Sequence, residues 1–126
     1  VYMTDSKSDQ QVPPIDVSVL EQLARDIDVA IIPNLIEISL KDGSERLAQI
    51  KSALASCDDT ALAAAIHALA GNAASCGLME LSHTLNECEN SFRRDDAEGG
   101  RASAARVLAL APSAFELLSD YLKSLD

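Results

Sequence analysis

The sequence predicts an all-α protein, an antiparallel four-helix bundle with a short additional N-terminal helix. Three observations predict this fold class. Alanine and leucine dominate the 126 residues and only 3% are aromatic, a composition typical of helical bundles. Apolar residues recur at alternating steps of three and four along most of the chain, which is the period of a helix face. The strict apolar–polar alternation of a β-strand is absent from it.

The size and charge of the chain limit the classes of partner. A length of 126 residues with 48% hydrophobic residues suffices for one domain with its own core, which we place at residues 15–126. The net charge of −10 leaves no basic patch for phosphates, so we expect no nucleic-acid partner. No apolar run is long enough for a membrane span and no signal peptide is visible, so we expect a cytoplasmic protein without a membrane partner.

The N-terminal part is expected to combine a tail with a short helix. Residues 1–14 are polar and end in two prolines, which predicts a flexible tail. Asp16 is a suitable N-cap for the short helix that follows. Its apolar face is expected to consist of Val19, Leu20, Leu23 and Ile27.

The segment 29–56 allows two interpretations. Asp42-Gly43-Ser44 resembles a turn, which would divide the segment into two helices. One heptad phase nevertheless continues through the glycine, on Ile36, Leu40, Gly43, Leu47, Ile50 and Leu54. A hairpin has no need to keep this phase, so we predict one long helix that tolerates a cost of about 1 kcal/mol at Gly43. Pro33 then belongs in its first turn.

Two further helices are predicted in the middle of the chain. After a loop over residues 56–60, the first extends over about 60–75, and Gly77 is expected to end it in the left-handed conformation. The second extends from Leu78 to about residue 94 with the same apolar spacing.

The C-terminal part is expected to hold one polar connection and one long helix. All of residues 93–100 except Ala97 are charged or glycine, which predicts a long loop. The final helix carries apolar residues in phase from Ala104 to Leu125. This phase continues past Pro112, so we expect the proline to bend the helix rather than end it.

The three cysteines, Cys57, Cys76 and Cys88, have neither zinc-site spacing nor an even number. We interpret all three as small buried apolar residues in a reducing compartment.

His67 points away from the predicted core. At about 100° per residue, the apolar residues of its helix lie roughly 120–180° from it. The face around His67 instead carries small residues, namely Thr60, Ala63, Ala64, Ala70, Gly71 and Ala74, which we call the small-residue face. A smooth apolar surface around one exposed imidazole predicts a docking site for a partner. The alternative is an alanine-rich helix with an incidental histidine.

The segment His67-Ala68-Leu69-Ala70-Gly71, followed by Gly77 and then by Leu81, Leu85 and Glu89, resembles the histidine-containing phosphotransfer (HPt) domain. Members of that family carry H-x-L-K-G, a glycine ten residues after the histidine and a leucine-spaced helix. The resemblance extends over roughly residues 15–125.

The resemblance implies a phosphocarrier without catalytic activity of its own. His67 would accept a phosphoryl group from the aspartyl-phosphate of a response-regulator receiver domain and pass it to another receiver. The implied partners are receiver domains and a hybrid sensor histidine kinase. No cofactor is implied in the domain itself, since the receiver would supply Mg²⁺. We expect a monomer because no second apolar stripe is left over.

The resemblance also implies roles for two residues of the following helix. Glu89 would hydrogen-bond Nδ1 of His67, and the alternative is an ordinary solvated acid. Arg93 would contact the phosphoryl group or a partner acid, and the alternative is a cation favoured by the helix C-terminus. Ala63, Ala64, Ala70, Gly71 and Ala74 would contact the receiver.

One departure from the family pattern favours a second interpretation. Ala70 stands where the family usually has lysine, so a phosphoryl group on His67 lacks a nearby cation. The alternative function is a non-phosphorylated adaptor that binds receiver or kinase domains through the same face. A purely structural bundle is a third reading.

The other histidine has a different setting. His83 ends the only E-x-x-H string, Glu80 to His83, and di-iron bundles need two inward-facing copies. We therefore expect His83 on the solvated surface without a metal.

Overall fold

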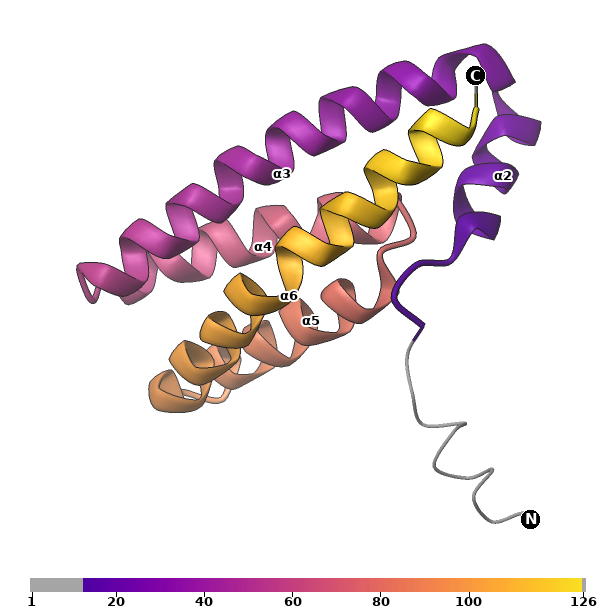
Figure 1. Ribbon diagram of the computed structural model, residues 1–126. Helices are drawn as coiled ribbons and strands as arrows, with labels where there is room; N and C mark the ends of the chain where they lie inside the picture. The colour runs from indigo at the N-terminus through magenta and orange to yellow at the C-terminus, as the bar shows by residue number, and fades with distance from the viewer. Residues whose placement is uncertain (1–12, 126) are drawn as a thin grey trace, which may run out of the picture.

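The structure is a computed structural model that describes residues 13–125 (Figure 1). The regular elements in this part of the chain are all helical, which confirms the predicted fold class. They are α2 (Val17–Asp26), the 3₁₀ turn η1 (Val29–Ile31), α3 (Ile32–Ala55), α4 (Asp59–Ser75), α5 (Met79–Arg93) and α6 (Ala97–Ser124). Helix α3 packs on α4 and α6, and α5 packs on α4 and α6, so the four long helices close into a bundle. Of the tail expected over residues 1–14, residues 1–12 lie outside the described part.

The long helix α3 continues through Gly43, as the heptad phase predicts. Pro33 lies in its first turn, where no backbone hydrogen bond is lost. The structure also explains why position 43 is a glycine. A Cβ atom added at Gly43 would lie 2.8 Å from Cζ of Phe115 on α6, so the absent side chain lets the aromatic ring pack directly on the α3 backbone.

The three connections between the long helices share one geometry. Each contains a residue with positive φ, Cys57 (56°), Gly77 (73°) or Asp95 (61°). The backbone N–H of the next residue then donates to the carbonyl five residues earlier, at 3.0 Å for Asp58 to Ala53. This is the Schellman motif, which satisfies the last carbonyls of a helix. The expected left-handed cap at Gly77 is confirmed.

Gly77 has a second structural role. The N–H of Asp16 donates to the Gly77 carbonyl oxygen at 2.7 Å, and a Cβ atom at Gly77 would collide with the Asp16 carbonyl oxygen. The Asp16 carboxylate in turn accepts from the N–H of Ser18 and caps α2. The glycine therefore positions the entry to α2 against the end of α4.

One expected boundary is corrected by the structure. The loop predicted over residues 93–100 is shorter, because Asp96 accepts from the N–H of Gly99 at 2.9 Å and starts α6 at Ala97. Gly100 lies against the Phe92 ring, so this glycine serves close packing of α5 and α6, whereas Gly99 lies against the capping carboxylate of Asp96. Helix α6 then continues through Pro112 to Ser124.

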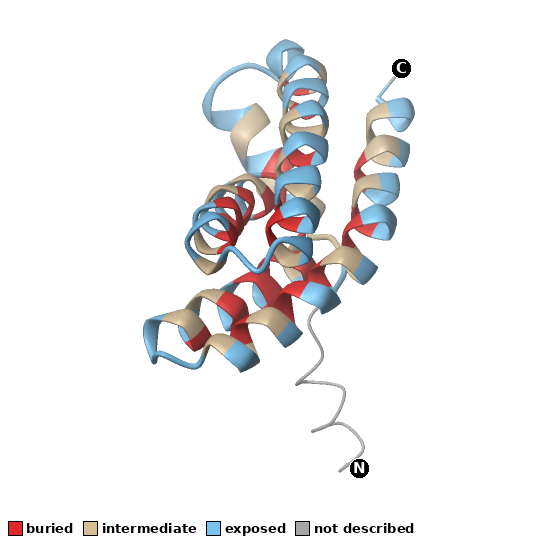
Figure 2. Ribbon diagram, turned by 90° about the vertical axis from the view of Figure 1, so that its left-hand side faces the viewer, coloured by how far each residue is buried: buried red, intermediate tan, exposed pale blue. Residues whose placement is uncertain are grey.

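The core lies between the four long helices, and buried positions form stripes on their inner sides (Figure 2). Three predicted core positions are wrong. Leu125, the last residue of the apolar stripe expected on the final helix, is 38% exposed. Ile27 is exposed because α2 ends at Asp26. Cys57 is exposed because it occupies the left-handed turn between α3 and α4, whereas Cys76 and Cys88 are buried. Within residues 13–125, no helix combines the length and the apolarity needed to cross a membrane.

Candidate functional site

His67 lies in the middle of α4 with its ring in solvent. Asp58 caps the helix by accepting from the N–H of Ala61 at 3.0 Å. Ile66 and Leu69, on the other side of the helix, are fully buried and fix its rotation. The His67 side chain is 81% exposed, so the helix presents the imidazole outward, as the rotation argument predicts.

Glu89 approaches the imidazole from the neighbouring helix α5. The Nδ1 atom of His67 and the Oε2 atom of Glu89 are 2.7 Å apart, and the Glu89 side chain is only 19% exposed. An ionised carboxylate can only accept hydrogen bonds, so Nδ1 must carry the proton and donate it. In the neutral ring the lone pair is then on Nε2. The pair holds the imidazole in one orientation with its nucleophilic nitrogen directed away from Glu89.

The small-residue face is mostly exposed, with one correction. Ala64, Gly71 and Ala74 are exposed and Ala63 is half-buried. Ala70 is only 8% exposed, so the expectation that it belongs to the accessible face is wrong. It lies about 60° of rotation from His67 on the side opposite Asn72, which bonds to α3, and α5 covers this side.

Gly71 has no packing partner in the described part of the chain. A Cβ atom added there would meet no atom within 4 Å. Glycine in a helix interior costs about 1 kcal/mol relative to alanine. The packing of this chain therefore does not account for the glycine, unlike Gly43 and Gly77.

Arg93 is exposed at the end of α5 and its Nη1 atom donates to Oδ1 of Asn90 at 2.8 Å. It is one helical turn beyond Glu89, on the same side of the helix. In this conformation the guanidinium is engaged along its own helix and not with His67 or Glu89.

His83 lies on the outer surface of α5, as expected. Its Nε2 atom is 3.7 Å from Oε2 of Glu87. Among residues 13–125 no group of three potential ligand side chains could hold a metal ion.

The comparisons with known proteins agree with this geometry. A model of the Hpt domain family matches residues 34–126, which include His67, Glu89 and the four long helices except the first two residues of α3. The chain belongs to the Hpt domain family. No relative is found among curated protein sequences.

Two solved structures extend the comparison. Histidine-containing phosphotransfer protein B (HptB) from Pseudomonas aeruginosa is 26% identical, with a TM-score of 0.74 over 89% of this chain and 93% of that protein. The HPT domain of a sensor hybrid histidine kinase from Shewanella is 17% identical, with a TM-score of 0.76 over 88% of this chain and 95% of that domain. The second likeness is one of fold. As a member of the family, this Hpt domain has a histidine phosphotransfer role in phosphorelay, with partners such as receiver domains.

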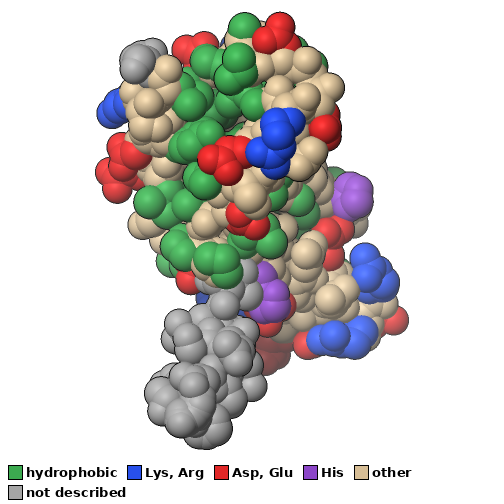
Figure 3. All heavy atoms as spheres, turned by 90° about the vertical axis from the view of Figure 1, so that its right-hand side faces the viewer, with side chains coloured by type: hydrophobic (Ala, Val, Ile, Leu, Met, Phe, Trp, Pro, Cys, Tyr) green, Lys and Arg blue, Asp and Glu red, His purple; other side chains and the backbone are tan. Residues whose placement is uncertain are grey.

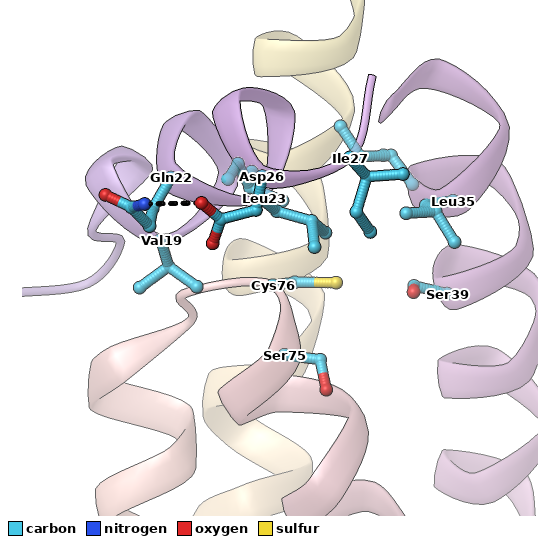
Figure 4. A pocket seen from close by; sticks show the side chains of 11 residues that line it. Val19, Gln22, Leu23, Asp26, Ile27, Leu35, Ser39, Ser75 and Cys76 are labelled. Atoms are coloured by element: carbon cyan, nitrogen blue, oxygen red, sulfur yellow. Dashed lines mark hydrogen bonds between the residues drawn. The ribbon is translucent and has the colours of Figure 1, made fainter. Parts of the chain in front are cut away.

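This Hpt domain also has an exposed apolar surface that the sequence reasoning missed. Ile27, Val29, Ile31 and Ile38 are exposed, and hydrophobic side chains gather over α2 and the start of α3 (Figure 3). Beneath them lies a cleft of about 530 Å³ between α2, α3 and the end of α4, lined by Val19, Leu23, Leu35 and Cys76 among others (Figure 4). The sequence contains an indication of this surface. Residues 29–32 are four consecutive apolar residues, and one face of a helix cannot bury all four.

The apolar cleft leads toward the face that carries His67. Ser39 of α3 and Ser75 of α4 line both this cleft and a shallow groove that ends at Gly71 and Asn72. A polar contact joins α4 to α3 at this groove, since Nδ2 of Asn72 donates to the Ser39 carbonyl and to Asp42 Oδ2, both at 3.0 Å. The exposed apolar surface and the face around His67 are therefore continuous.

Proposed function

We propose that this Hpt domain is a phosphorelay intermediate that accepts a phosphoryl group on Nε2 of His67 from the aspartyl-phosphate of a receiver domain and passes it to another receiver. The observation that carries the proposal is the pairing of an exposed imidazole with the largely buried carboxylate of Glu89 through Nδ1. This pairing supplies a nucleophilic Nε2 in a defined orientation.

The proposed phosphoryl transfer forms one bond to phosphorus and breaks another. The Nε2 lone pair attacks phosphorus, the bond between phosphorus and the aspartyl oxygen breaks, and the receiver's carboxylate leaves with the bonding electrons. Nδ1 keeps its proton, so the phosphorylated ring gains a positive charge that the Glu89 carboxylate stabilises. Transfer to a second receiver is the reverse. Receiver-bound Mg²⁺ would stabilise the transferring group, and the domain itself would supply no further catalytic group.

The docking surface for the receiver is proposed to combine the small-residue face with the exposed apolar surface. Alanines and a glycine let another backbone approach the imidazole closely. Ile38 lines one end of the groove that ends at Gly71, and Val29 adds exposed apolar area on the neighbouring surface. Arg93, at the other side of His67, would meet the acidic groups of a receiver or the phosphoryl group. A hybrid sensor histidine kinase would supply the first receiver.

The phosphotransfer experiment uses a phosphorylated receiver with radiolabelled phosphate. Wild-type protein is expected to acquire an acid-labile, base-stable label, and His67→Gln to acquire none. Retention of the label in His67→Gln would overturn the assignment of His67.

A second experiment separates phosphotransfer from the adaptor function, which Ala70 favours because it lacks the usual cation. Ala64→Glu places a charge on the small-residue face, and Ala109→Glu places the same charge on an exposed position of α6. We expect only Ala64→Glu to prevent labelling. If a receiver binds wild type but not Ala64→Glu, and no receiver labels wild type, the domain is an adaptor.

A further inference from the structure

A second cleft lies between α5 and α6, away from the phospho-accepting face. Its volume is about 250 Å³ and its lining residues are Glu87, Asn90, Ser91, Arg94, Ser103 and Arg106. Its α5 residues lie roughly 100–200° of rotation from Glu89, so this is the opposite side of the helix. The lining is polar throughout, in contrast to the apolar cleft beneath α2.

Two serines with little exposed surface line this cleft. Ser91 is 7% exposed and Ser103 is 6% exposed, and neither side chain makes a hydrogen bond within the described residues. The nearby Thr84 shows the usual alternative, since its hydroxyl donates to the Glu80 carbonyl one turn earlier at 3.1 Å. Neither hydroxyl oxygen is among the buried side-chain atoms that lack a partner, so both keep surface toward the cleft. They are therefore available to hydrogen-bond a ligand there.

The charges at the cleft favour an anion. Arg94 is exposed and makes no side-chain hydrogen bond or ion pair among residues 13–125. Arg106 donates through Nη2 to Oε1 of Glu87 at 2.7 Å, which leaves its other N–H groups available. Asn90 uses its oxygen for Arg93, so its amide N–H groups are also available. Donors from two helices thus converge on a small volume.

Glu87 is the only acid among the lining residues. Its Oε1 atom is bonded to Arg106, and its Oε2 atom lies 3.7 Å from Nε2 of His83. The carboxylate holds Arg106 in place and leaves Arg94 as the uncompensated cation. A chain with a net charge of −10 thus carries a local excess of positive charge here.

We propose that this cleft binds a phosphate group, either as inorganic phosphate or as a small phosphate monoester. The oxygens of a tetrahedral phosphate can accept from the guanidinium of Arg94, the free N–H groups of Arg106 and both serine hydroxyls at once. A carboxylate has two oxygens and would satisfy fewer of these donors. The site does not depend on phosphotransfer by His67.

The test is a titration of the ¹⁵N-labelled full chain with inorganic phosphate at constant ionic strength, followed by amide NMR shifts and by Tm. We expect saturable shifts centred on Ser91, Arg94 and Ser103, with a Kd on the order of 1 mM, and a rise in Tm with phosphate. Arg94→Gln and Ser103→Ala are each expected to weaken binding about tenfold. The matched control, Arg25→Gln, removes the same charge from α2 and should bind as wild type.

Three outcomes decide the proposal. Absence of saturable shifts at the cleft would overturn it, and so would equal weakening by Arg25→Gln and Arg94→Gln, because the effect would then be general screening. His67→Gln is expected to bind phosphate normally, so failure of phosphotransfer and failure of this site are distinguishable. A parallel titration with glycerol phosphate identifies the source, since tighter binding than inorganic phosphate assigns a monoester and weaker binding assigns the free ion.

Discussion

The Nδ1 atom of His67 and the Oε2 atom of Glu89 lie 2.7 Å apart although 22 residues separate them in the chain. One partner is in solvent and the other is largely buried, so the carboxylate is held by the bundle while the ring projects from it. This asymmetry makes α5 a support for the reactive group on α4.

The contribution of Glu89 can be measured by two substitutions. Glu89→Gln keeps an acceptor for Nδ1–H but loses the charge, and Glu89→Ala loses both. We expect the rate of phosphorylation by a receiver to fall in the order wild type, Gln, Ala, with Ala about ten- to a hundredfold slower, as the loss of a charge-assisted hydrogen bond implies. Glu80→Ala, at an exposed acid of the same helix, is the control and should react normally. Equal rates in all variants would show that Glu89 does not contribute to the phosphorylation of His67.

Gly71 and Gly43 are expected to respond oppositely to alanine. Gly71→Ala adds a methyl group in open space and removes a poor helix former, so stability to urea should rise by about 1 kcal/mol. Gly43→Ala places its Cβ 2.8 Å from the Phe115 ring, so stability should fall by about 1–3 kcal/mol. A stabilised Gly71→Ala variant that is phosphorylated more slowly would support docking at this position. A destabilised Gly71→Ala variant would contradict the open space around it.

The left-handed turns offer a stability gain. Cys57 has φ 56°, a conformation that costs a residue with a side chain roughly 1–2 kcal/mol. Cys57→Gly is therefore expected to stabilise the fold by about 0.5–1 kcal/mol, measured by urea unfolding. Gly77→Ala is the reciprocal variant and should lose more than about 1 kcal/mol, because the new methyl group also meets the Asp16 carbonyl. An unchanged free energy of unfolding in both variants would contradict the proposed cost of positive φ at these turns.

Cys88 should make stability fall at alkaline pH. Burial, aided by the neighbouring charge of Glu89 and opposed by Arg106, raises the pKa of the Cys88 thiol from 9.0 to about 11. The folded state thus keeps the thiol neutral while the unfolded state ionises, so this stabilisation is complete below pH 9.0 and is lost between pH 9.0 and about 11. Urea unfolding across this range should show a shallower decline for Cys88→Ala. Cys57→Ala, at an exposed cysteine, should retain the wild-type slope.

Ala70→Lys restores the cation that the family usually carries. Position 70 is only 8% exposed, so the lysine stem would lie along the protein surface with its ammonium group in solvent. The substitution should then shift the phosphoryl equilibrium with a receiver toward His67 by up to about fivefold, the range of a surface ion pair. Ala105→Lys adds the same charge at an exposed position of α6 and should leave the equilibrium unchanged. Phosphorylated fractions at equilibrium provide the measurement. An equal shift in both variants would indicate an effect of net charge alone.

Much of the fold was accessible from local pattern. The heptad phase through Gly43 predicted a single α3, because a continuous apolar stripe requires a continuous helix. The outward direction of His67 followed from rotation about one helix axis. Local pattern misplaces the start of α6, because two consecutive glycines at 99 and 100 favour a loop, whereas contact with Phe92 and the Asp96 cap place them in a helix.

The sequence by itself determined the elements, the exposed histidine and the family resemblance, since these depend on periodicity and spacing within one segment. Only the tertiary structure decided that Glu89 lies beside Nδ1, that Ala70 is covered by α5 and that Ile27 and Val29 remain exposed. It also decided that Ser91 and Ser103 line one cleft with Arg94. Contacts between helices depend on how the helices are rotated and offset when they pack, and the spacing within each helix does not contain that information.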